Sequence, residues 1–186
     1  MFDLKEKKRI PLLGVEAQIY EHSSFSCKHI HLDCESNEKS FLVAFRTIPK
    51  DSTGIAHILE HTVLCGSKRY PVRDPFFMMI RRSLSTFMNA MTSQDTTMYP
   101  FSSVNDQDFK NLLDVYLDAA FFPNLNELDF MQEGHRYEIE KGKNNEEKLL
   151  LKGVVYNEMI GAMSSVPSQL YQGLSEFLYP KTTYKY

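Results

Sequence analysis

The spacing of apolar residues changes near Thr53, and this change constrains the fold more than any other feature of the sequence. Before Thr53, three short segments alternate or are rich in β-branched residues, and polar turns separate them. They predict strands over Ala17–Glu21, Lys28–Cys34 and Ser40–Thr47, which could pair as an antiparallel meander. After Thr53, the spacing becomes that of helices.

The helical part of the sequence contains five periodic segments. The first expected helix has Ser52 or Thr53 as its N-cap and ends at Gly66. The second covers Pro75–Leu84 with Asp74 as its N-cap. The other three cover Asp106–Phe121, Glu146–Met163 and Ser168–Leu178. A β-type stretch, Phe87–Ser102, lies between two of them, and the polar run Lys141–Lys148 predicts a surface loop. Strands followed by helices favour an α+β fold, with a two-layer arrangement of an antiparallel sheet and helices packed on one face.

Composition excludes several classes of protein. The chain has 186 residues, 42% hydrophobic and 24% charged, which suits one soluble globular domain and excludes disorder, collagen and coiled coil. A net charge of -3 provides no broad field for nucleic acid or an anionic membrane, and no apolar run is long enough to span a bilayer. Three cysteines without a CxxC pair favour reduced thiols. The first ten residues carry no targeting pattern, which predicts a cytoplasmic location.

The segment His57–His61 is an H-x-x-E-H motif inside the first expected helix. At about 100° per residue, His57 and His61 lie one turn apart, and Glu60 lies on the same side. The apolar residues Ile55 and Leu59 centre on the opposite side, which predicts one face for the core and one for chemistry. Two imidazoles at this spacing can share one zinc ion and leave the carboxylate free to accept a proton.

Two histidines and a glutamate at this spacing can also form a solvated helix face without a metal. A third ligand would decide between a zinc site and a solvated face. Glu158 is a candidate, because it shares its expected helical face with Leu151 and Val154, where an ionised carboxylate is costly without a partner. A buried salt bridge to a lysine or arginine is the alternative. Cys65, one turn beyond His61, is a softer possible ligand, although a cysteine there is more often a buried apolar residue.

Six motifs occur in order along nearly the whole chain. They are Gly54–His61 (GIAHILEH), Cys65–Ser67 (CGS), Tyr70–Phe76 (YPVRDPF), Asn89–Ser93 (NAMTS), Gln132–Gly134 (QEG) and Lys152–Met159 (KGVVYNEM). With them the chain resembles the inverzincin metallopeptidases of the pitrilysin and insulin-degrading type, and within these the presequence-protease branch that includes falcilysin.

This resemblance implies a role for each matching residue. His57, His61 and Glu158 would bind one Zn²⁺ per chain, and Glu60 would act as general base in the hydrolysis of peptides. Asn89 and Ala90 would lie against the substrate backbone on an edge strand, which would hold unstructured peptides by β-augmentation. His135 stands where the family is expected to show tryptophan, and we interpret it as a structural variant rather than a further ligand.

The resemblance also implies a larger assembly. Residues 1–186 would form the N-terminal part of the first, zinc-binding catalytic domain of a four-domain clamshell peptidase, incomplete at its C-terminal end. The remainder of the enzyme would be a partner that supplies an arginine and a tyrosine to stabilise the substrate carbonyl.

On this interpretation the chain by itself would bind zinc and peptide weakly, cleave slowly or not at all, and expose a sheet edge that favours self-association. The alternative is a non-catalytic relative of the same fold that serves as a scaffold or binds peptides. The presence of His57, Glu60, His61 and Glu158 together favours the peptidase.

Overall fold

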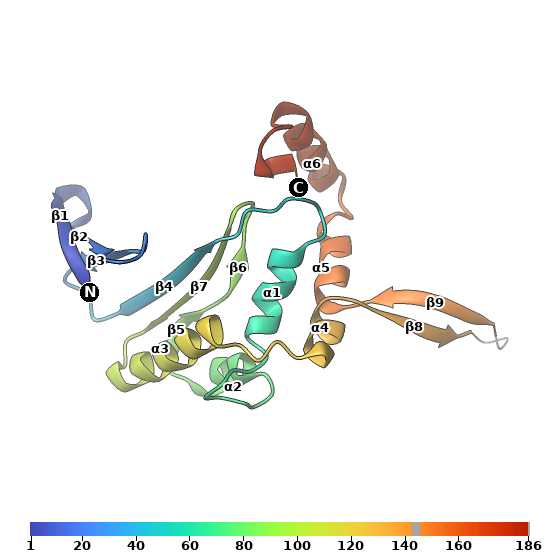
Figure 1. Ribbon diagram of the computed structural model, residues 1–186, viewed down its shortest axis with the longest axis horizontal. Coiled ribbons are helices and arrows are strands. Elements are labelled where there is room, and N and C mark those ends of the chain that lie inside the picture. The colour runs from blue at the N-terminus through green and yellow to red at the C-terminus, as the bar shows by residue number, and fades with distance from the viewer. Residues whose placement is uncertain (143–145, 186) are drawn as a thin grey trace. The chain divides into compact units, whose positions relative to one another are not determined.

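The computed structural model describes residues 1–142 and 146–185 and confirms the predicted α+β class (Figure 1). The chain divides into two compact units, Met1–Glu38 and Lys39–Tyr186. The first consists of strands and one short 3-10 helix, whereas the second combines antiparallel strands with α-helices. No helix within the described ranges has both the length and the apolar character needed to cross a bilayer.

The first unit is an antiparallel meander of three strands in the order β1-β2-β3. Its strands are β1 (Phe2–Ile10), β2 (Val15–His22) and β3 (Lys28–Asp33), and the short 3-10 helix η1 (Pro11–Leu13) joins the first two. The pairing of the second and third strands was predicted. The strand β1 was not predicted, because the lysine, glutamate and aspartate residues that it contains are uncommon in strands.

The second unit is built on a four-stranded antiparallel sheet with β7 at its centre. The strands are β4 (Lys39–Arg46), β5 (Ser85–Met88), β6 (Met91–Thr92) and β7 (Thr96–Ser103). The prediction that the Ser40–Thr47 strand continues the N-terminal meander is wrong. This strand, β4, pairs instead with β7, where Phe41 lies opposite Phe101 and joins it in the core.

Helices cover one face of this sheet and enclose the core of the unit. The helix α3 (Asp106–Phe121) has the predicted bounds and places Leu112, Tyr116 and Ala119 against Tyr99 and Phe101 of β7. Two further helices, α1 (Ile55–Val63) and α2 (Pro75–Arg82), contribute Val63, Leu64 at the end of α1, and Phe76. The core therefore forms between β4 and β7 on one side and three helices on the other.

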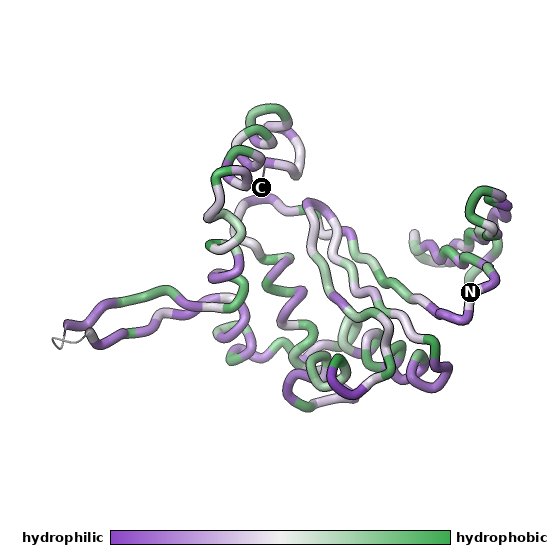
Figure 2. Tube along the Cα trace, turned by 180° about the vertical axis from the view of Figure 1, so that it is seen from behind, coloured by the Kyte–Doolittle hydropathy of each residue, from purple (hydrophilic) through white to green (hydrophobic). Residues whose placement is uncertain are grey.

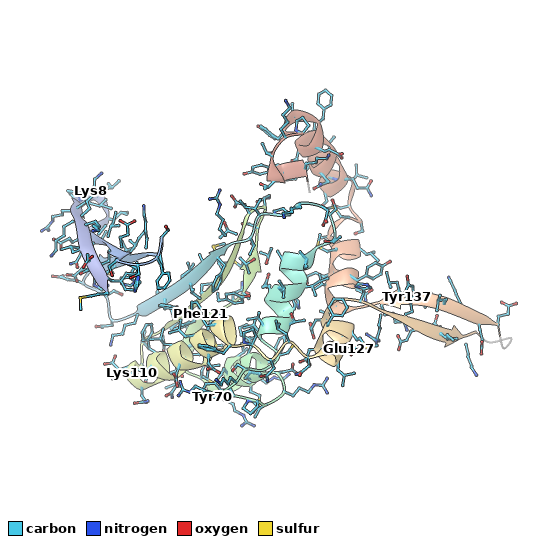
Figure 3. The ribbon with its side chains drawn as sticks, viewed as in Figure 1. Lys8, Tyr70, Lys110, Phe121, Glu127 and Tyr137 are labelled. Atoms are coloured by element: carbon cyan, nitrogen blue, oxygen red, sulfur yellow. The ribbon has the colours of Figure 1, made fainter. Side chains whose placement is uncertain are left out.

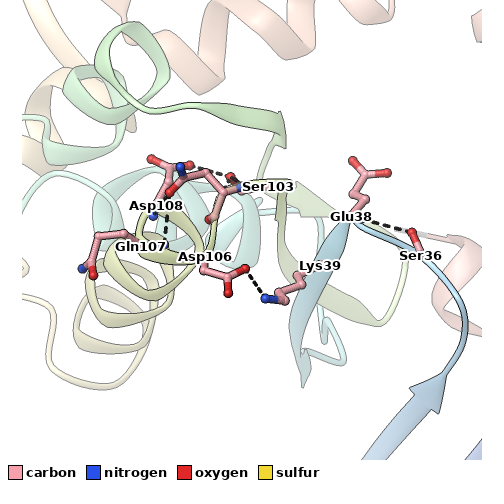
Figure 4. Close-up of polar contacts among 8 residues, drawn as sticks. Ser36, Glu38, Lys39, Ser103, Asp106, Gln107 and Asp108 are labelled. Carbon is pink, nitrogen blue, oxygen red and sulfur yellow. Dashed lines mark hydrogen bonds and ion pairs between the residues drawn. The ribbon is translucent and has the colours of Figure 1, made fainter.

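The start of α3 is held by polar contacts (Figure 4). The Asn105 side chain accepts hydrogen bonds from the backbone N–H groups of Gln107 and Asp108. Asp108 also accepts a hydrogen bond of 2.8 Å from Ser103, and Asp106 forms an ion pair with Lys39 of β4. These contacts fix the helix to both core strands.

The expected N-caps of the first two helices are only partly confirmed. Neither Ser52 nor Thr53 caps α1, whose N-cap is Gly54 with a left-handed φ of 72°. Asp51 accepts hydrogen bonds from Thr53 instead. Asp74 is the N-cap of α2 but makes no side-chain capping bond.

The helix predicted over Glu146–Met163 is wrong in its first half. The residues form a strand, β9 (Glu147–Lys152), before α5 begins (Val154–Ala162). β9 pairs with β8 (Arg136–Lys141), and in the ladder Leu149 lies opposite Ile139 and Leu151 opposite Tyr137. Within the predicted loop Lys141–Lys148, Lys141 ends β8 and Glu147 and Lys148 begin β9, while residues 143–145 lie outside the described residues.

Three elements complete the second unit. The short helix α4 (Glu127–Glu133) was not predicted, α6 (Val166–Leu178) begins two residues before its expected start, and η2 (Thr183–Lys185) follows it. The β8–β9 hairpin projects from the side of the unit that carries α4 and α5 (Figure 1).

Apolar side chains remain exposed on α6 and on the β8–β9 hairpin. Figure 2 shows the hydrophobic residues of both elements in green. On α6, Phe177 is 81% exposed, and Val166 and Leu170 are exposed as well. On the hairpin, Tyr137 is 73% exposed (Figure 3). The expectation of self-association remains a prediction.

Replacing Asn105 with alanine should destabilise the second unit. Its side-chain oxygen accepts two backbone hydrogen bonds of 3.0 Å, so N105A should lower the free energy of unfolding by about 1 kcal/mol. Urea denaturation followed by circular dichroism measures this change. Asn126, the N-cap of α4, makes no capping bond, and N126A is the matched control. Equal losses in both variants would contradict the role given to Asn105.

Candidate metal centre

Helix α1 presents its two histidines side by side, as the H-x-x-E-H spacing predicts. The ring centroids of His57 and His61 are 5.1 Å apart, and both side chains are partly buried. Because the residues are one helical turn apart, both imidazoles project from the same stripe of the helix. Two of the expected ligands are therefore placed together by local structure alone.

Glu158 of α5 faces this pair of imidazoles. Its Oε2 atom lies 3.7 Å from Nε2 of His57 and 3.7 Å from Nε2 of His61. Two ligand atoms that each lie about 2.1 Å from one tetrahedral zinc ion are about 3.4 Å apart, so these three residues fit a shared metal. Across residues 1–142 and 146–185, no other group of three histidine, cysteine or acidic side chains meets the geometric test for a metal site.

Glu158 does not lie on the buried apolar helical face that the sequence predicted. Leu151 belongs to β9 rather than to a helix, and the Glu158 side chain is 54% exposed. The carboxylate is therefore not forced to find a partner by apolar burial. Its orientation toward the two imidazoles is what connects it to the site.

Glu133, at the end of α4, is a site residue that the sequence analysis missed. Its Oε2 atom lies 3.0 Å from Nδ1 of His61, and its side chain is buried. This hydrogen bond is the main cause that raises the pKa of His61 and lowers the pKa of Glu133. A partner on Nδ1 leaves Nε2 directed toward Glu158, which is the usual arrangement around a metal-binding histidine. In the sequence, Glu133 stood out only as part of the QEG motif. Its contact with His61 could not be predicted, because it depends on how α4 packs against α1.

Glu60 lies beside the three candidate ligands in one cavity. The cavity has a volume of about 540 Å³, and it is lined by His57, Glu60, His61, Glu133 and Glu158 together with apolar side chains that include Phe77 and Ile80. Glu60 is only 6% exposed. The four residues predicted to act in catalysis or metal binding, His57, Glu60, His61 and Glu158, therefore line one cavity. Glu60 is the one that does not belong to the ligand cluster.

Asn89 and Ala90 also line this cavity. They connect β5 to the short strand β6, which pairs with β7. The backbone of Asn89 is held by its N–H, which donates to Pro100, and by its carbonyl, which accepts from Tyr116. The structure thus brings both predicted substrate-contact residues to the cavity that holds the histidines.

The apolar face predicted for α1 does not join the core. Ile55 is 63% exposed, and Ile55 and Leu59 line a separate apolar cavity of about 480 Å³. Thr62, which lies on the same predicted face, is buried, as are Glu60 and Val63. His135 lines this second cavity, with its ring 5.3 Å from that of Phe130, and is not part of the ligand cluster.

Cys65 is buried and lies outside the ligand cluster, as the apolar interpretation predicts. Its thiol donates to the backbone carbonyl of His61 over 3.5 Å. Burial raises the pKa of Cys65 to about 12. A thiol that stays protonated is a poor metal ligand.

Two glycines bring the elements of the site close together. A Cβ atom on Gly153 would lie 1.9 Å from the carbonyl oxygen of Gly134, and one on Gly134 would lie 2.9 Å from the carbonyl oxygen of Phe130. Gly134 follows Glu133, and Gly153 is the N-cap of α5. Because neither position has room for a side chain, glycine permits the end of α4 and the start of α5 to pack closely, and both helices also contact α1.

Comparison with known proteins identifies the family. Residues 46–166 match the model of the family described as Insulinase (Peptidase family M16). The chain belongs to this family. It is 52% identical over 183 residues to the mitochondrial presequence protease of Xenopus tropicalis and 51% identical over 183 residues to that of Mus musculus. These alignments cover 98% of the chain and 18% of each relative.

More distant comparisons agree with the fold. The chain is 50% identical over 179 residues to the mitochondrial presequence protease of Yarrowia lipolytica. A crystal structure of pitrilysin superposes with a TM-score of 0.67 at 16% identity, covering 99% of this chain and 18% of that chain. The expected resemblance to insulinase-type peptidases is confirmed, and at this identity the pitrilysin match supports the fold alone.

The predicted cytoplasmic location is contradicted by these relatives. The presequence proteases of Xenopus tropicalis, Mus musculus and Yarrowia lipolytica are all named as mitochondrial. The absence of a targeting pattern in the first ten residues was therefore a poor guide to location.

Replacing Gly153 with alanine should destabilise the α4–α5 corner. The added methyl group cannot fit against Gly134 without moving backbone, so we expect the free energy of unfolding to fall by about 1–3 kcal/mol. Chemical denaturation measures the loss. Gly173 in α6 has nothing within 4 Å of its Cβ position, so G173A should be neutral or slightly stabilising. Unchanged stability of G153A would show that the corner is not tightly packed.

Cys65 should resist alkylation at neutral pH while the protein is folded. The reactive species is the thiolate, and a pKa near 12 leaves little of it, whereas Cys27 and Cys34 are exposed. Iodoacetamide labelling followed by mass spectrometry should modify Cys27 and Cys34 first and Cys65 only after unfolding in urea. Labelling of all three at one rate would contradict the burial of Cys65.

Proposed function

We propose that this chain carries the zinc centre of a metallopeptidase that hydrolyses unfolded peptides. The observation that supports the proposal is the convergence of His57, His61 and Glu158 within ligand distance of one another, with Glu60 in the same cavity. Membership of the insulinase family supports a peptidase, and the donor set of two imidazoles and a carboxylate suits zinc.

His57, His61 and Glu158 would hold the metal. Bound zinc would supply a Lewis acid that polarises the peptide carbonyl and lowers the pKa of water. Glu60 would accept a proton from the attacking water and deliver it to the nitrogen of the leaving amine. The hydrogen bond from His61 to Glu133 would keep the imidazole oriented during this cycle.

The substrate would lie along β6 and the neighbouring residues Asn89 and Ala90. An edge strand binds extended peptide through backbone hydrogen bonds, which depend little on sequence. We therefore propose that the substrates are unstructured peptides of varied sequence. The names of the relatives, presequence protease and mitochondrial, support peptides of that kind and a mitochondrial location.

The activity would belong to the whole protein. The chain spans about 18% of the length of the curated relatives it matches. We propose that residues 1–186 form the N-terminal part of the zinc-binding domain of a longer peptidase. On this view the rest of the enzyme is its partner, and the chain alone cleaves peptides slowly or not at all.

Two substitutions separate metal binding from proton transfer. E158A should lose zinc, because only two imidazole ligands remain, whereas E60Q should keep zinc and lower peptide hydrolysis by the whole protein by about 10²–10⁴-fold. Metal analysis measures the first effect, and cleavage of an unstructured peptide with and without a chelator measures the second.

H135A is the matched control, because His135 lies near α1 but outside the ligand cluster. It should leave both zinc content and hydrolysis unchanged. A folded wild-type protein without zinc would refute the metal site. Zinc binding without hydrolysis by the whole protein would favour the alternative of a peptide-binding scaffold.

A further inference from the structure

A chain of hydrogen bonds leads from the protein surface to the candidate ligand His61. Arg73 donates from NH2 to Oε1 of Gln132 over 2.6 Å, and Gln132 donates from Nε2 to Oε1 of Glu133 over 2.8 Å. The other oxygen of Glu133 lies 3.0 Å from Nδ1 of His61. The four side chains come from the loop before α2, from α4 and from α1.

We propose that Gln132 and Arg73 are positioning residues for the zinc ligand His61 and act on it through Glu133. This inference rests on the proposed zinc centre. Neither side chain is one of the ligands, and neither Gln132 nor Arg73 lines the cavity that holds them.

The amide of Gln132 fixes the carboxylate of Glu133. An amide has one acceptor end and one donor end, and here Arg73 uses the acceptor and Glu133 uses the donor. The orientation of the amide is therefore set by its neighbours. Because one carboxylate oxygen is held by Gln132, the other is directed at His61, where it can accept a hydrogen bond from Nδ1–H and leave Nε2 available to a metal.

The strength of this effect should fall with distance from the metal. Glu133 is buried and touches His61 directly, whereas the Arg73 side chain is 74% exposed and also lies 3.4 Å from the carboxylate of Asp74. Hydrogen bonds of exposed, mobile side chains contribute less than buried ones. The order of importance should therefore be Glu133, then Gln132, then Arg73.

The test compares zinc affinity among variants of the whole protein, measured by competition with a chelating dye. Q132A should weaken zinc binding by about tenfold, the lower end of the range for partners of metal ligands, and R73A by less. R73K should bind more tightly than R73A, because a lysine can still donate to the Gln132 amide. The visible absorption bands of the Co²⁺-substituted protein should shift in Q132A, since they report the geometry of the ligands.

Q107A and R69Q are the matched controls. Gln107 also lies on a helix and donates to a neighbouring side chain, Asn111, and Arg69 also forms an exposed ion pair, with Asp114. Neither is part of the chain that leads to His61, so both variants should keep the wild-type zinc affinity and Co²⁺ spectrum. Circular dichroism establishes that each variant is folded, and alanine at position 132 suits the helix that contains it.

The outcomes separate this inference from the proposed zinc centre. Wild-type affinity and spectrum in folded Q132A would overturn the positioning role while leaving the zinc centre in place. Equal weakening in Q132A and Q107A would also overturn it, because the effect would then be one of general stability. A wild-type protein that binds no zinc would overturn both proposals. Weakened binding in Q132A and, to a smaller extent, in R73A, with recovery in R73K and wild-type affinity in Q107A and R69Q, would support the role.

Discussion

The candidate site depends on the close approach of α5 to α1. His57 and His61 are neighbours through helix geometry alone, whereas Glu158 comes from α5, whose N-cap Gly153 packs closely against the backbone of Gly134. Any side chain larger than a hydrogen at this contact would separate the two segments. The same contact places Glu133 behind His61. One packing interaction between backbones therefore brings together a ligand, its supporting carboxylate and the two imidazoles.

Local patterns predicted the parts of the fold and site that depend on local structure. Helix α3 has the expected bounds, since its periodicity and the proline that follows it, Pro123, lie within one segment. The pairing of His57 with His61 follows from their spacing in the same way. The bounds of α5 were wrong, because a run of leucines at 149–151 suits a helix or a strand equally well and only the pairing with β8 decides.

Interactions between distant segments could not be predicted from residue patterns. The partner of β4 is β7, about fifty residues further along the chain, and their shared aromatic residues select this register once both are present. Glu133 shows the same limit, because nothing in its immediate sequence indicates His61 as a neighbour. The role of Glu158 was implied by resemblance to a family, and the burial argument offered for it did not hold.

The β8–β9 hairpin lies between Glu133 and Glu158 in the chain and leaves the body of the unit at the point where the two glycines meet. Because Gly134 and Gly153 meet at the base of the hairpin, the positions of the Glu133 and Glu158 carboxylates do not depend on how many residues the hairpin contains. A relative with a longer or shorter hairpin would have the same arrangement of donors in space and a different interval between them in sequence. The order of the donors and the contact at the root therefore describe such a site better than a fixed count of intervening residues.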